Sequence, residues 1–260
     1  MNSILICEGS TDFVLLQYFM RGVFEWEDDM MGPGFLRPSR KFKKGNNHLT
    51  IGGVGGCSKI IPNLEKIIES NSLSASDTEY YEKIVIVTDR DDVETENNFM
   101  QKIEEILLRH QVLMSQEFTG NKWNSGTLKN ARNEQMPLKI LVLVIPFEET
   151  GALETFLLKA IGKQSEYDKN IILKGNDFVD SVDPDKRYLT SRRYITKAKF
   201  DVYFSIRTPS AFFVERQNIL KGIEWENIWK FKNVLKSWAN YDTLIQAKTG
   251  LFPALKLGML

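Results

Sequence analysis

The feature that most constrains the fold is a short, largely apolar run that recurs within the first 145 residues, followed each time by a turn and a helix-like segment. The runs lie at 3–7, 49–54, 83–88 and 139–145. Strands that are apolar along their whole length, rather than at alternate positions, are buried on both faces of a sheet. Strands that alternate with helices form parallel sheets. We therefore expect an α/β fold with a mainly parallel sheet flanked by helices.

Two stretches interrupt this alternation, and the last third of the chain departs from it. Residues 22–48 include five basic side chains within eight positions, and 119–137 is rich in Asn, Gly, Lys and Thr, so we expect surface loops or hairpins there. From about residue 165 onward there are helix-like pieces, such as 228–238, and no long apolar strand. We therefore expect an α/β domain at 1–162 and a smaller, mainly helical region at 163–260.

Composition limits the compartment and the classes of site. Hydrophobic residues make up 42% of the chain and charged residues 26%, as in ordinary soluble proteins. Lys plus Arg and Asp plus Glu both number 34, so net charge points to no particular partner. Two distant cysteines and two histidines favour neither a disulfide scaffold nor a histidine-based zinc site. The N-terminal apolar run is too short for a signal peptide or a membrane span, so we expect a cytoplasmic protein without membrane association.

Acidic residues directly follow two of the predicted strands. Glu8 follows the first strand, and Asp89 and Asp91 follow the third. In open α/β sheets, ligands bind at the carboxyl ends of the strands. Converging carboxylates repel one another, and a divalent cation with oxygen ligands, Mg²⁺ or Mn²⁺, relieves that repulsion. The alternative is that these acids only cap the helices that follow.

The same residues resemble the TOPRIM domain shared by type IA and type II topoisomerases, bacterial primases and OLD-family nucleases. That family has a glutamate followed by glycine after its first strand and an Asp-x-Asp after a later strand. These elements stand here in ILICEGSTD and IVIVTDRDD, and the resemblance covers about residues 1–162. It implies a TOPRIM-like, Rossmann-like fold in which Glu8 acts as general acid or base while Asp89 and Asp91 hold Mg²⁺.

The OLD-type branch of the family carries further acids, and Asp12 and Glu154 resemble them. They would hold a second metal ion, although both are also ordinary positions for acids on helices. The segment KAKFDVYFSIRTPS is similar to the end of small standalone TOPRIM proteins, which makes Lys197, or else Lys199, a phosphate contact and a catalytic candidate. The chain has no Walker motif, so an ATPase like those of OLD-type phage defence systems would be a separate chain.

Two further stretches adjoin the predicted site. The glycines at 52–56 fit neither a dinucleotide fingerprint nor a P-loop. The alternative that we keep for them is a tight turn whose backbone approaches a phosphate. A basic cluster lies in the predicted loop between the first two strands. It is either a solvated surface or a contact for a nucleic-acid backbone, and it consists of Arg37, Arg40, Lys41, Lys43 and Lys44.

Together these features predict an Mg²⁺- or Mn²⁺-dependent nuclease that cleaves phosphodiester bonds in DNA or RNA, in a defence or repair system. The alternative from another class is a non-catalytic TOPRIM-fold module that binds a nucleotide or nucleic acid. A lesser alternative is a phosphotransferase or nucleotide-phosphate hydrolase that uses the same metal. Nucleic acid is the expected partner, and a separate ATPase and a second copy of the chain are the other partners to consider. The acids should cluster in space beside an open face if the first prediction holds.

Overall fold

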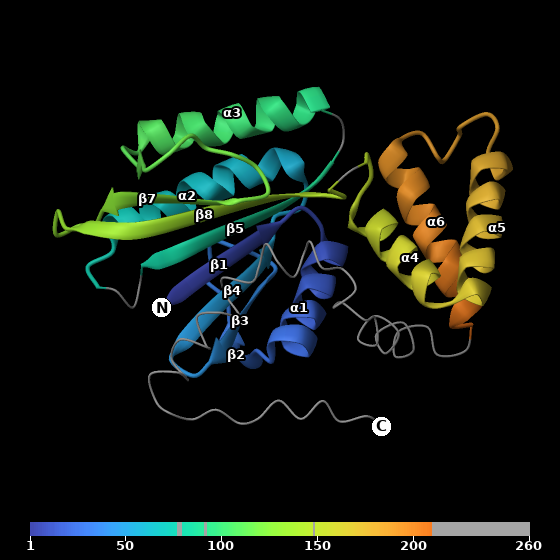
Figure 1. Cartoon of the computed structure of the whole chain (residues 1–260), viewed down its shortest axis with the longest axis horizontal. Coiled ribbons are helices and arrows are strands. Elements are labelled where there is room, and N and C mark those ends of the chain that lie inside the picture. The colour runs from blue at the N-terminus through green and yellow to red at the C-terminus, as the bar shows by residue number, and fades with distance from the viewer. Residues whose placement is uncertain (77–79, 91–92, 148, 210–260) are drawn as a thin grey trace.

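The protein combines a single twisted sheet, covered by helices on both faces, with a group of helices at one end of that sheet (Figure 1). The computed structural model describes residues 1–76, 80–90, 93–147 and 149–209, without the side chains of 93–95. In chain order the elements are β1 (Asn2–Cys7), α1 (Ser10–Phe24), β2 (Glu27–Met31), β3 (Ser39–Lys44), β4 (Asn47–Gly53), the 3-10 helix η1 (Cys57–Lys59), α2 (Ile60–Leu73), β5 (Tyr81–Asp89), α3 (Val93–Arg109), β6 (Leu113–Met114), β7 (Trp123–Lys129), β8 (Gln135–Ile145), α4 (Leu153–Gln164), α5 (Glu166–Val182) and α6 (Arg192–Arg207).

Within the described residues, eight strands form one sheet in the order β2-β3-β4-β1-β5-β8-β7-β6. The four central strands are parallel, and their carboxyl ends meet at one edge, where Cys7 is paired with both Gly53 and Val87. Asp89 is paired with Ile145 at the same edge. The predicted α/β fold with its flanked, centrally parallel sheet is therefore confirmed. The outer strands are antiparallel, and β2, β3 and β7 come from the two stretches expected to form loops or hairpins, whereas β6 precedes the second stretch.

The apolar character of the central strands follows from burial on both faces. Successive side chains of a strand point to opposite faces. In β1, Leu5 and Cys7 pack into the core beneath α1, whereas Ile4 and Ile6 pack into the core beneath α2 and α3. Figure 1 shows the two layers, with α2 and α3 on one side of the sheet and α1 on the other. A strand with two buried faces has few positions for a charged side chain until it ends, which favours acids at the strand ends.

The helices α4, α5 and α6 stand beside the carboxyl ends of the parallel strands (Figure 1). Their side chains Leu157, Ile172 and Phe204 belong to the same buried core as α1 and the strands. The boundary expected at residue 162 falls inside α4, and the helix-like piece expected at 228–238 lies outside the described residues. No helix in the described part of the chain is both long enough and apolar enough to cross a membrane.

Candidate active site

A turn held by glycines presents Glu8 at the end of β1. The backbone carbonyl of Glu8 accepts hydrogen bonds from the N–H groups of Gly55 and Gly56, both at 2.8 Å. Gly55 and Gly56 have φ angles of +82° and +130°, in the region that favours glycine. A Cβ atom added at Gly53 would lie 3.2 Å from the carbonyl oxygen of Gly9. The glycine segment thus closes tightly around the Glu8 turn, and the two N–H groups are used inside the protein rather than presented to a phosphate.

The side chain of Glu8 joins the ends of β1 and β5. Its Oε1 atom accepts hydrogen bonds from the hydroxyl of Thr88, at 2.5 Å, and from the backbone N–H of Asp89, at 3.0 Å. Glu8 and Asp89 therefore lie together at one edge of the sheet, as their positions after neighbouring strands predict. Asp91 lies outside the described residues.

Two more acids enter this edge from the first turns of helices. Asp12 of α1 is only 7% exposed and accepts a hydrogen bond from the backbone N–H of Gly9 at 2.8 Å, so it also caps its helix. Burial, followed by the nearby charge of Glu154, raises the pKa of Asp12 to about 6. Glu154 of α4 is 5% exposed, and burial also raises its pKa, while Lys197 and Arg193 partly oppose that rise.

The pKa of Asp89 is affected by burial and by all three of the other acids. Burial raises its pKa to about 8, and the carboxylates of Asp12, Glu8 and Glu154 contribute in that order. One hydrogen bond, from the backbone N–H of Leu153 to Oδ1 at 3.3 Å, opposes the rise. A cluster in which acids raise one another's pKa is short of positive charge, which is the electrostatic condition for a cation site.

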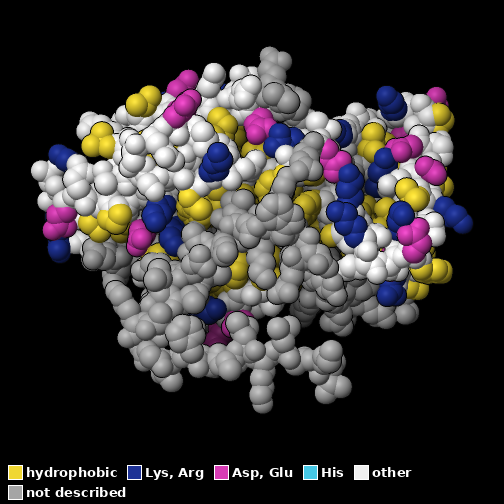
Figure 2. Space-filling model, in the orientation of Figure 1, with side chains coloured by type: hydrophobic (Ala, Val, Ile, Leu, Met, Phe, Trp, Pro, Cys, Tyr) yellow, Lys and Arg dark blue, Asp and Glu magenta, His cyan; other side chains and the backbone are white. Residues whose placement is uncertain are grey.

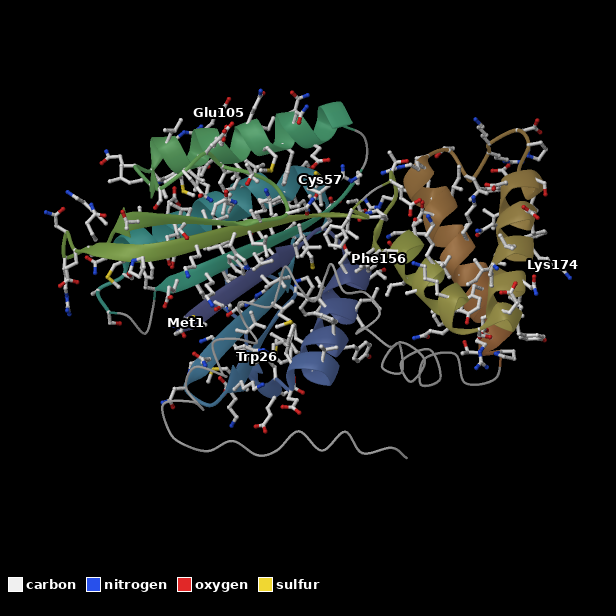
Figure 3. The ribbon with its side chains drawn as sticks, in the orientation of Figure 1. Met1, Trp26, Cys57, Glu105, Phe156 and Lys174 are labelled. Carbon is white, nitrogen blue, oxygen red and sulfur yellow. The ribbon has the colours of Figure 1, made fainter. Side chains whose placement is uncertain are left out.

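These acids line a cavity of about 190 Å³ whose opposite wall is the N-terminal half of α6. Figure 3 shows Cys57, which also lines the cavity, at the junction between the sheet and the helical group. Lys197 lines the cavity as the resemblance implies, whereas Lys199 forms an ion pair with Asp180 at 2.7 Å. Lys197 is therefore the lysine that remains a candidate.

The sequence did not identify three other residues of this wall. Arg192, Arg193 and Thr196 line the cavity with Lys197, and Arg193 lies one helical turn before Lys197 on the same face of α6. Arg192 donates a hydrogen bond to the backbone carbonyl of Arg90 at 2.9 Å, which fastens α6 to the end of β5. In the sequence, the i, i+4 spacing of Arg193 and Lys197 indicates that the two cations share one helix face. It does not show which acids that face contacts.

A second acidic group lies on α2 and just after α3. Among the described residues, Glu65, Glu69 and His110 are the only three potential ligands whose atoms all lie within 4.8 Å of one another. Arg109 already pairs with Glu65 at 2.7 Å. Hydrogen bonds from His110 and then Arg109 lower the pKa of Glu65. The negative charge of Glu65 is therefore already balanced by Arg109.

Four of the five residues of the basic cluster lie in a hairpin strand, so of the expected loop or hairpin it is the hairpin that forms here. Residues 39–44 form β3, because Phe42 is fully buried and the strand is paired with β4. Lys43 and Lys44 lie at the amino end of β4, opposite His48 and Asn47, whereas the acid cavity lies at the carboxyl end. Lys44 also donates to the Phe24 carbonyl at 2.9 Å. The cluster runs along the sheet and does not converge on the cavity.

Comparison with known proteins gives a family and distant structural similarity. A model of the family described as "Protein of unknown function (DUF3226)" matches residues 2–240. A solved structure of a hypothetical protein from Pyrococcus horikoshii OT3 is 17% identical, with 86% of this chain and 98% of that chain covered and a TM-score of 0.45. A lactoylglutathione lyase from Agrobacterium tumefaciens is 15% identical, with 54% and 91% covered and a TM-score of 0.17. None of the curated proteins compared with the chain matches it. Because the family match spans most of the sequence, the chain belongs to the DUF3226 family of proteins of unknown function.

Proposed function

We propose that this protein is an Mg²⁺- or Mn²⁺-dependent nuclease that hydrolyses phosphodiester bonds at the strand-end cavity. The observation that carries the proposal is the group of four acids, Glu8, Asp12, Asp89 and Glu154, brought together from two strand ends and two helix starts. Burial is the largest cause of the raised pKa values of Asp12, Asp89 and Glu154, and neighbouring carboxylates add to it at Asp12 and Asp89. The TOPRIM resemblance of the segments around Glu8 and Asp89 supports the same chemistry.

The ligand types of this donor set suit a hard divalent cation. Asp12, Asp89 and Glu154 offer carboxylate oxygens, which Mg²⁺ and Mn²⁺ prefer over softer ligands, and Asp91 is a further candidate from the resemblance. When bound, such an ion polarises a phosphoryl oxygen and balances charge that develops during hydrolysis. Binding would also relieve the mutual repulsion that raises the pKa of Asp89.

The protein groups around the cavity have distinct roles in this proposal. Glu8 is held by Thr88 and by the Asp89 backbone, so its carboxylate has a fixed direction and serves to take a proton from the attacking water. Lys197 and Arg193 face the acids from α6 and bind the non-bridging oxygens of the phosphate. Arg192 keeps that wall in place through its hydrogen bond to Arg90.

Incubation of the purified protein with DNA and RNA substrates in Mn²⁺ tests the proposal. We expect nicking or degradation that EDTA stops and that Asp89→Asn abolishes, because the amide cannot supply the charge that the site requires. Cleavage by Asp89→Asn at the wild-type rate would assign the activity to a contaminant or another site. Absence of cleavage in every substrate, also when a candidate partner ATPase is added, would favour the non-catalytic binding module.

A further inference from the structure

A second, larger hollow adjoins the acid cavity and takes no part in the chemistry proposed above. It lies between α4, α5 and α6 and has a volume of about 820 Å³, within the range of about 300–1,000 Å³ typical of ligand sites. Arg192 and Thr196 line both this groove and the acid cavity. A chain-like ligand bound in the groove would therefore continue directly into the acid cavity.

The groove combines an apolar floor with a cationic rim. Leu158 and Ile172 are buried in the floor, and Leu173 is 51% exposed beside them. Five cationic side chains line the groove against a single carboxylate, Glu166. Lys and Arg side chains are spread among acidic ones over this part of the surface (Figure 2). The five cations are Lys159, Lys163, Lys169, Arg192 and Lys199.

Three of the lysines have carboxylate partners that a phosphate can replace. Lys159 pairs with Glu149, Lys169 with Glu166 at 3.1 Å, and Lys199 with Asp180 at 2.7 Å. Solvent-exposed pairs of this kind contribute at most about 1 kcal/mol and are screened by salt, so they exchange readily for a stronger anion. No described carboxylate lies within ion-pair distance of Lys163, which is exposed at the end of α4. Lys163 is therefore the rim cation best placed to meet a ligand.

The groove also contains an unsatisfied hydrogen-bonding atom. The Oδ1 atom of Asn176, in α5, is buried and has no hydrogen-bond partner among the described residues. An amide group beside apolar side chains suits the edge of a nucleobase, which offers both donors and acceptors.

We propose that this groove binds single-stranded nucleic acid and feeds it to the acid cavity. The inference rests on the proposed nuclease function, whose substrate class it specifies. A duplex presents its phosphates outward and keeps its base faces stacked inside, so it would use the cationic rim and leave the apolar floor exposed. A single strand presents phosphates and base faces together, which matches the rim and the floor at once.

Fluorescence anisotropy of labelled single-stranded DNA and RNA oligonucleotides, in EDTA so that no cleavage occurs, tests the groove. Lys163→Glu should weaken binding at least about fivefold and reduce the salt slope of the affinity by about 0.7 for the lost phosphate contact. Lys174→Glu is the matched control, since Lys174 is exposed on α5 outside the groove and projects away from α4 and α6 (Figure 3). It makes the same charge change in the same helical group and should bind as the wild type. A duplex of equal length should bind more weakly than the single strand.

Equal affinities for Lys163→Glu and Lys174→Glu would overturn the proposal, as would tighter binding of the duplex than of the single strand. Hydrolysis of bis(4-nitrophenyl) phosphate by the wild type in Mn²⁺ separates the two proposals, because this small diester needs only the acid cavity. If the diester is hydrolysed while Lys163→Glu has no effect on binding, the groove proposal fails and the nuclease proposal stands. If Lys163→Glu weakens single-strand binding while no diester is cleaved, the groove proposal stands and the nuclease proposal fails.

Discussion

The protein contains two groups of acids that share chemistry and differ in what surrounds them. At the strand ends, Asp12 and Asp89 are buried near other carboxylates, and their pKa values rise to about 6 and about 8. On α2, Glu65 lies at the surface beside Arg109 and His110, and its pKa is lowered. The tighter geometry belongs to the surface group, whereas the greater electrostatic need for a cation belongs to the buried one.

The difference shows that close spacing of ligand atoms does not by itself mark a functional site. Arg109 pairs with Glu65, so the closeness of this group follows at least in part from ion pairing. At the strand ends, the protein retains buried charge that weakens its own stability. Unfavourable charge of this kind is common at sites that bind or react with ligands. The experiments below change the same chemical group in both places.

The largest difference is expected in phosphodiester hydrolysis. Glu8→Gln keeps the shape of the side chain but cannot take a proton, so we expect the Mn²⁺-dependent rate to fall at least about 100-fold, the lower end of general-base contributions. Glu65→Gln makes the same change on α2 and should leave the rate unaltered. Circular dichroism of both variants controls for folding. If Glu8→Gln hydrolyses the substrate as fast as Glu65→Gln, the catalytic role of the strand-end acids is lost.

A smaller difference is expected in the pH dependence of stability without metal. The pKa of Asp89 is about 8 in the folded protein, against about 3.9 in an unfolded chain. Between these pH values the folded state binds more protons, so its stability decreases as the pH rises from about 4 to about 8. Asp89→Asn removes this loss. In EDTA, we expect its melting temperature to exceed that of the wild type by at least about 2 °C at pH 8, with a difference that shrinks as the pH falls and vanishes only below about pH 4.

A difference in melting temperature between the wild type and Asp89→Asn that stays constant from pH 5 to pH 8 would contradict that expectation. It would mean that a protein cation already balances Asp89, as Arg109 balances Glu65.

The smallest effect is expected at Glu65, with the opposite sign. Its pKa is lower in the folded protein, so its contribution to stability is present above the unfolded pKa and is lost as the pH falls through the folded value. Glu65→Gln should therefore lower the melting temperature slightly at pH 7, by less than the Asp89 effect, and this difference should disappear as the pH falls below the folded pKa. Salt should reduce the difference at pH 7, because the pair is exposed to solvent. A rise in melting temperature at pH 7 would show that Glu65 is repelled rather than paired.

The central part of the fold could be predicted from the sequence, and its edges could not. The predicted runs at 3–7 and 83–88 became β1 and β5, because doubly buried strands must be apolar along their length. β3 was missed because its sequence, SRKFKK, has four basic residues and only one large apolar side chain. Its backbone pairing with β4 and the burial of Phe42 are tertiary effects that no local pattern contains.

The site shows the same division. Glu8 and Asp89 could be placed together, because the carboxyl ends of neighbouring parallel strands share one edge. Lys197 was located through the resemblance, and the structure separated it from Lys199 because only Lys197 lines the acid cavity. Arg193 was missed because α6 meets the acids only through packing of the helical group and the anchor on Arg90. Acid positions follow from topology, whereas the facing wall follows from contacts across more than one hundred residues of chain.

Thermal unfolding with increasing Mn²⁺ in the wild type, Asp89→Asn and Glu65→Gln decides which acids bind a cation. We expect Mn²⁺ to stabilise the wild type and Glu65→Gln alike, by about 2.7 kcal/mol when the ion reaches 100 times its Kd. Asp89→Asn should show no stabilisation over the same range. Loss of the Mn²⁺ effect in Glu65→Gln, with the effect retained in Asp89→Asn, would place the ion on α2 and contradict a metal centre at the strand ends.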